Sequence, residues 1–149
     1  MHERRELLLH FLATLDYRTS KALDGAPAGF GDFQAGEGVR TPAELVAHMS
    51  SLLSYTLVSF GGAAGDPPGR SADFHAEIAR FQQLLRRLAS TLAASPLQQE
   101  GLAEQLLQGP FSDAMTHAGQ LALLRRLAGS PISAENFFVA PISAQKLLA

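Results

Sequence analysis

The segment PFSDAMTHAGQLALLRRLAGS, residues 110–130, carries more structural information than any other part of the chain. The Gly109-Pro110 pair at its beginning is typical of a helix start, because proline fits the first turn of a helix. Gly129 and Pro131 at its other end are typical of a helix end. We therefore expect a single long helix between these two breaks.

The apolar face of this helix contains two polar residues, Asp113 and His117. They are four residues apart and so lie one turn above each other, and Leu121, Leu124 and Ala128 continue the same face. A carboxylate and an imidazole among leucines are costly unless both find partners. A divalent metal ion would satisfy both groups. The alternative is hydrogen bonding to neighbours, with the Asp113 carboxylate also stabilised by the dipole of the helix N-terminus.

Length and composition narrow the class of protein. The 149 residues fit one domain, residues 1–149, and 46% apolar residues support a buried core. The net charge of −2 gives no general basic field, so we expect no nucleic-acid partner. There is no cysteine, which excludes disulfides, a thiolate nucleophile and cysteine-bound zinc.

The N-terminal apolar run is interrupted by His10, Asp16 and Arg18, which is typical of an amphipathic helix and not of a signal peptide. No apolar run approaches the roughly 20 residues of a membrane span. We expect a cytoplasmic protein without a membrane partner.

Apolar residues at helical spacing predict four long helices, and no stretch shows the alternation of a strand. Asp24–Arg40, rich in glycine, is expected to form a long loop, and Gly61–Arg70 a linker. The expected fold is all-α, an up-and-down four-helix bundle with a long first crossover loop and short extra helices. The long helices are expected at residues 3–23, 41–60, from 71 onward and 110–130.

Two capping boxes are predicted. Thr41-Pro42-Ala43-Glu44 should begin the second long helix, with proline at its first helical position. Ser95-Pro96-Leu97-Gln98 should begin a short helix that ends near Leu107, with Ser71 as the cap of the third long helix.

His48 lies at the edge of the apolar arc of the second helix, so antiparallel packing could bring it to Asp113 and His117. Two imidazoles and one carboxylate suit zinc or nickel, and also iron or manganese. Three protein ligands leave an open position for water, a thiol or a substrate. Alternatively, both histidines lie at the edge of the core and bond to neighbouring groups.

Three further residues are candidates for orienting a ligand or a metal-binding side chain. Glu44 precedes His48 by one turn, although its role in the capping box explains it more simply. Tyr55 is on the same side of that helix, and Gln120 is one turn beyond His117.

TPAELVAHM at 41–49, followed by DAMTHAGQLALLRRLAGSP at 113–131, resembles the DinB/YfiT-like family, and the similarity extends from the first helix to Pro131. The resemblance implies a four-helix bundle with one histidine on the second helix and two on a later helix, spaced i and i+4. His48 and His117 match the first and last of these ligands. Asp113 stands where the family has its middle histidine, which makes the set two histidines and one carboxylate.

The resemblance implies a metal-dependent enzyme acting on a small molecule, either a hydrolase or a thiol-dependent transferase. It also implies a homodimer, for which the ends of the first and third helices offer leucine and phenylalanine. The alternatives are a bundle that binds a small ligand without turnover, or a structural protein with a degenerate metal site.

Overall fold

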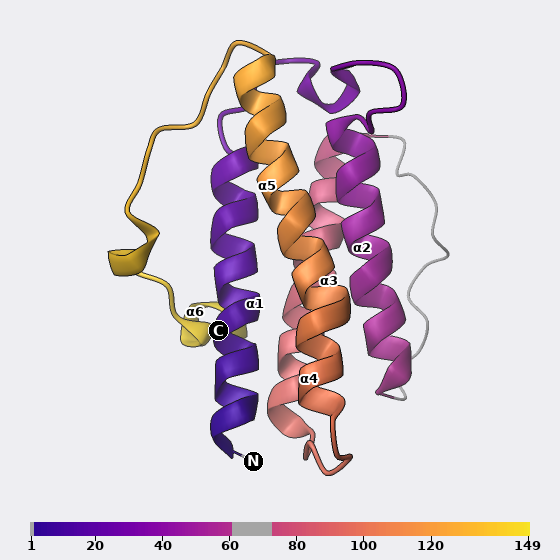
Figure 1. Cartoon of the computed structure of the whole chain (residues 1–149), viewed down its shortest axis with the longest axis vertical. Helices are drawn as coiled ribbons and strands as arrows, with labels where there is room; N and C mark the ends of the chain where they lie inside the picture. Colours follow the sequence, from indigo (N-terminus) through magenta and orange to yellow (C-terminus); the bar gives the residue numbers. More distant parts are fainter. Residues whose placement is uncertain (1, 61–72) are drawn as a thin grey trace.

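The computed structural model describes residues 2–60 and 73–149, and every regular element within these ranges is a helix (Figure 1). The predicted all-α class is therefore confirmed for this part of the chain. The long helices are α1 (His2–Leu23), α2 (Pro42–Ser59), α3 (Phe74–Ala94) and α5 (Ser112–Leu127). Short elements are η1 (Phe30–Asp32), α4 (Leu102–Leu106), η2 (Leu107–Phe111), η3 (Phe137–Val139) and α6 (Ala144–Leu148).

The four long helices form a bundle in which α1 packs against α3 and α5, and α2 packs against the same two helices. Their apolar stripes face inward and bury large side chains completely. Each long helix or its flanking turn contributes fully buried side chains to the core, among them Leu12, Met49, Leu53, Phe81, Leu88, Phe111 and Leu121. Within the described ranges, no helix combines the length and the apolar character needed to cross a membrane.

The direction of α3 follows from contacts at its two ends. Phe74, its first residue, packs against Phe30 just beyond the end of α1, with ring centroids 6.4 Å apart. Arg5, near the start of α1, donates a hydrogen bond to the carbonyl of Ser95 at the end of α3, at 3.4 Å. α3 therefore runs antiparallel to α1.

α2 begins at the same end of the bundle as α3, so these two helices run in the same direction (Figure 1). The alternating order predicted from the sequence is not the order in the structure. The connection from α2 to α3 includes the predicted Gly61–Arg70 linker and the predicted cap Ser71, which lie outside the described residues. Its 12 residues could reach about 40 Å when extended, whereas an 18-residue helix is about 27 Å long. A change of direction between consecutive helices was therefore not required.

The Asp24–Arg40 loop crosses the end of the bundle from α1 to α2 (Figure 1). These helices lie at opposite corners, because each packs between α3 and α5. Phe30 is buried in the core and anchors the loop there.

The two predicted capping boxes have different outcomes. Thr41 and Glu44 form the box reciprocally, each side chain accepting a hydrogen bond from the other's backbone N–H. The box at Ser95 is wrong, because the Ser95 hydroxyl donates to the Thr91 carbonyl at 2.6 Å and closes α3. The next helix, α4, begins only after Gly101, whose φ of 79° is in the left-handed region.

The structure has a kink where the helix at 110–130 was predicted to begin. Gly109 has φ −94° and ψ −105°, outside the helical region, and the turn η2 joins α4 to α5 around it. The Ser112 hydroxyl bonds to the carbonyl of Leu107 at 2.5 Å across this wider turn. α5 therefore begins at Ser112, two residues later than expected. It ends at Leu127, two residues before the predicted stop at Gly129, whose φ is 81°.

Arg125 ties the end of α5 to the end of α1. It is 5% exposed, and its guanidinium donates to the carbonyls of Ala22 and Asp24 at 3.0 Å, Gly25 at 3.4 Å and Ser130 at 2.9 Å. α5 consequently runs parallel to α1 and antiparallel to α2.

Candidate metal centre

His48 of α2 and Asp113 and His117 of α5 converge in the structure. One ligand atom from each lies within 4.8 Å of the other two. Asp113 Oδ1 is 3.2 Å from His117 Nε2, and Asp113 Oδ2 is 3.6 Å from His48 Nε2. Each carboxylate oxygen thus faces one imidazole, and the two rings also contact each other edge to face, with centroids 4.8 Å apart and nearly perpendicular planes.

Local structure positions each of these side chains. The η2 kink directly precedes Asp113, which therefore lies in the first turn of α5, where the helix dipole stabilises a carboxylate. His117 is one turn further along the same face. His48 reaches both because α2 packs against α5 in the opposite direction.

The two separations between the carboxylate and the imidazoles fit one small metal ion, whereas the whole set is bounded by the wider 4.8 Å. Zinc lies about 2.0–2.2 Å from nitrogen and oxygen ligands, so two ligands of a tetrahedral site are about 3.3–3.6 Å apart. The distances from the Asp113 oxygens to the two imidazoles are close to this range. The three donors are also the chemical types that zinc and other divalent transition metals bind.

The cluster is closed toward the core and open toward solvent. The His117 side chain is 10% exposed, that of His48 33% and that of Asp113 46%. An ion between them would therefore have protein on one side and free coordination positions on the other, which is the arrangement of catalytic metal sites.

His117 faces oxygen atoms with both ring nitrogens. Its Nδ1 is 2.8 Å from Gln120 Oε1, and its Nε2 is 3.2 Å from Asp113 Oδ1. A neutral imidazole has one N–H. When Nδ1 of a neutral ring donates to Gln120, the Nε2 lone pair points at a carboxylate. This contact becomes favourable when a cation lies between them or when Nε2 also carries a proton. Such a Gln120 contact also fixes the ring orientation, as partners of metal-bound histidines do.

Burial lowers the pKa of His48, and the positive charge of Arg40 and the neighbouring His117 lower it further. The Asp113 carboxylate opposes this shift. The net lowering favours the neutral imidazole, which is the form that binds a metal.

The other sequence candidates are placed differently. Glu44 takes part in the capping box through its side-chain oxygen, 3.3 Å from the Thr41 backbone nitrogen. Tyr55 is 78% exposed and lines the same hollow as Asp113. Of the three orienting candidates, Gln120 is the one hydrogen-bonded to His117.

Two surface hollows flank the cluster along the seam between α2 and α5. The first, about 640 Å³, extends from His117 and Gln120 to the end of α5 and the loop before α2 and is called the upper groove here. The second, about 590 Å³, extends from Asp113 to Tyr55 and is called the lower groove. Both volumes are within the range that small-molecule sites occupy.

Arg40 lines the upper groove and was not among the site residues predicted from the sequence. One signal was available: Arg40 directly precedes the Thr41 cap, and a cation is electrostatically unfavourable at a helix N-terminus.

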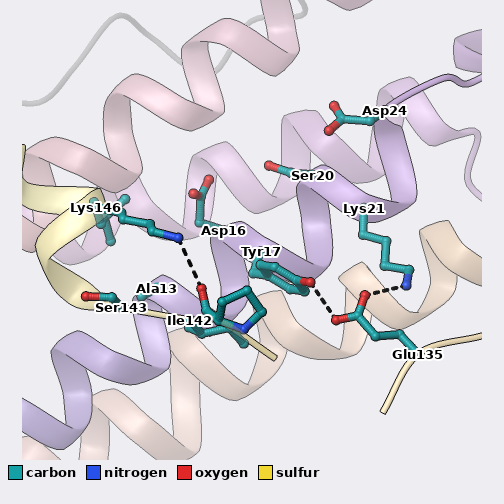
Figure 2. Close-up of a pocket in the computed structure, with 12 residues that line it drawn as sticks. Ala13, Asp16, Tyr17, Ser20, Lys21, Asp24, Glu135, Ile142, Ser143 and Lys146 are labelled. Atoms are coloured by element: carbon teal, nitrogen blue, oxygen red, sulfur yellow. Dashed lines mark hydrogen bonds and ion pairs between the residues drawn. The ribbon is translucent and has the colours of Figure 1, made fainter. Parts of the chain in front are cut away.

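A third hollow, about 520 Å³, lies between α1 and the C-terminal segment (Figure 2). Glu135 accepts hydrogen bonds from Tyr17 Oη at 2.5 Å and Lys21 Nζ at 2.6 Å, and these bonds lower its pKa. Burial raises the pKa of Asp16 in the same hollow. The Tyr17–Glu135–Lys21 bonds hold the C-terminal segment against α1, which is a structural role.

No family model, curated protein or solved structure matches this chain.

Proposed function

We propose that the chain binds one divalent metal ion through His48, Asp113 and His117 and acts as a metal-dependent enzyme on a small molecule. The observation that carries this proposal is the convergence of the three ligand atoms within 4.8 Å from two helices. Zinc or nickel is the proposed ion, with iron or manganese as the alternatives that the same donors accept.

We further propose that the chain is a member of the DinB/YfiT-like family. The resemblance of residues 41–49 and 113–131 to the family's motifs supports this, and so does the all-helical bundle. The carboxylate of Asp113 in the middle ligand position is the departure from the family pattern.

When bound at such a site, a divalent cation lowers the pKa of a water or thiol in its open position and polarises a substrate oxygen. The chain's own residues have simpler tasks. His48, Asp113 and His117 hold the ion, and Gln120 keeps His117 in the tautomer whose Nε2 is free to coordinate. Arg40 supplies positive charge close to the centre.

The presence of a groove on each side of the centre favours a transferase over a hydrolase. A hydrolase needs room for one organic ligand and a water, whereas a transfer reaction brings two organic ligands together. The upper groove contains His117 and the lower groove contains Asp113, so ligands in both would meet at the proposed ion.

A structural protein with a degenerate site is the second candidate. It is favoured by the Asp113 carboxylate, which is already within ion-pair distance of both imidazoles. That carboxylate could satisfy the polar atoms of both histidines without a metal. A bundle that binds a small ligand without turnover is the third.

Activity of three preparations distinguishes these functions: metal-loaded protein, chelator-treated protein and His117→Ala, on ester and thiol-conjugation substrates. Turnover by the metal-loaded protein alone supports the metalloenzyme. Equal turnover in all three contradicts it, and metal binding without turnover supports the ligand-binding bundle.

Metal affinity should depend steeply on pH. Histidine must lose its proton to coordinate, so zinc affinity should fall as the pH decreases below the ordinary histidine pKa of about 6.5. Because the pKa of His48 is lowered, this residue should remain competent to somewhat lower pH than an ordinary histidine. Competition titrations with a chromophoric chelator between pH 5 and 8 measure this. Constant affinity across the range would contradict histidine ligation.

We also propose that the chain forms a homodimer. Large apolar side chains are exposed outside the two grooves, among them Leu7 of α1 and Phe138 and Val139 of η3, which supports such an interface. The third helix expected from the sequence is less suitable, because no exposed large apolar residue lies within Phe74–Ala94. Light scattering at micromolar concentration should give twice the chain mass, and a monomer mass would contradict the proposal.

A further inference from the structure

The upper groove offers hydrogen-bond donors and no negatively charged side chain among the described residues that line it. Its walls are apolar, built largely from leucines of α5 and Leu45 of α2. Among the described residues that line it there is no carboxylate, whereas Arg40 and Gln120 offer N–H donors. Since Gln120 Oε1 already faces His117, its amide N–H groups remain available to a ligand. The groove therefore suits an apolar molecule that carries acceptor oxygens.

Arg40 gives this groove a charge preference. It has no carboxylate partner among the residues that the structure describes, and it lies directly before the N-terminus of α2, where the helix dipole is also positive. The guanidinium and the start of α2 therefore both attract a negatively charged ligand. A carboxylate is the group that an arginine recognises best, through two parallel hydrogen bonds.

We propose that the upper groove binds a small organic acid, with its carboxylate on Arg40 and its apolar body along the leucines of α5. As a statement about substrate class this rests on the proposed metal centre, because His117 at the other end of the groove directs the ligand toward that centre. Charge complementarity selects this occupant over a second copy of the chain, which would cover Leu123 and Leu127 but need not neutralise Arg40.

The test uses 4-phenylbutanoate as the probe and its neutral amide, 4-phenylbutanamide, as the matched ligand. Each is titrated into the full-length chain and followed by ¹H–¹⁵N NMR, once with excess chelator and once with one equivalent of zinc. The variants are Arg40→Gln and, as a control with the same charge change, Arg87→Gln on the exposed surface of α3. Zinc binding is measured separately, so failure of the metal centre and failure of the groove are distinguishable.

In the chelator-treated protein, the acid should shift the signals of Gly38 and the Gln120 side-chain amide and should bind about tenfold more tightly than the amide. Arg40→Gln should remove this preference, and Arg87→Gln should keep it. Equal binding of acid and amide, shifts elsewhere, or no binding at millimolar probe would overturn the proposal. Groove signals that respond to protein concentration but not to the acid would also overturn it, in favour of a second copy of the chain.

Discussion

His117→Ala is expected to weaken zinc binding by more than about 100-fold. Loss of a hydrogen-bonding partner of a ligand already costs about 10- to 100-fold, and His117 is itself a proposed ligand and the most buried of the three. Gln120→Ala should have the smaller effect of 10- to 100-fold, because it removes only the hydrogen bond to His117 Nδ1. Isothermal titration of the untagged protein with zinc measures both.

His10→Ala is the matched control for these variants. It removes an imidazole from the exposed surface of α1 and should leave zinc affinity unchanged. If His10→Ala and His117→Ala reduced affinity equally, zinc would be binding to surface histidines and not at the proposed centre.

Arg125→Met should reduce the free energy of unfolding by about 3 kcal/mol. It leaves buried carbonyl oxygens of the α1 end without their charged donor, and each such loss costs about 1–3 kcal/mol, although methionine retains part of the apolar contact. Urea denaturation followed by circular dichroism measures the change.

The neighbouring residue provides the control. Arg126 is exposed, so Arg126→Met changes the same charge by the same substitution and should alter stability by no more than about 0.5 kcal/mol. Similar losses for the two variants would show that net charge, and not the buried contacts of Arg125, determines stability.

Arg125 and Arg126 differ in a way that the sequence does not predict. Arg125 and Arg126 are adjacent in the last turn of one helix, and the favourable helix dipole accounts for both. Only the packing of α1 against α5 shows that one is buried and bonded to distant carbonyls. Nothing local in the sequence encodes contacts between residues about 100 positions apart.

The helices themselves were largely predictable, because apolar spacing and the Thr41 box are local signals with local causes. The direction of α3 was not, since a connection of 12 residues has enough length to allow either direction. Ser95 was misleading because serine bonds equally well to the helix before it and the helix after it.

The candidate site was predictable where spacing on one helix determines it. Asp113 and His117 share a face of α5 by their i, i+4 separation, and the apolar arc of α2 brings His48 to them. The grooves and the role of Arg40 depend on how the loop before α2 lies against α5, which no single helix pattern contains.

Zinc X-ray absorption spectroscopy of the protein loaded with one equivalent shows whether His48, Asp113 and His117 together bind one metal ion. We expect one tightly held zinc with two imidazole nitrogens and carboxylate oxygen at about 2.0–2.2 Å, and loss of this signature in His117→Ala. Zinc that is removed by gel filtration, or a first shell unchanged by His117→Ala, would contradict it.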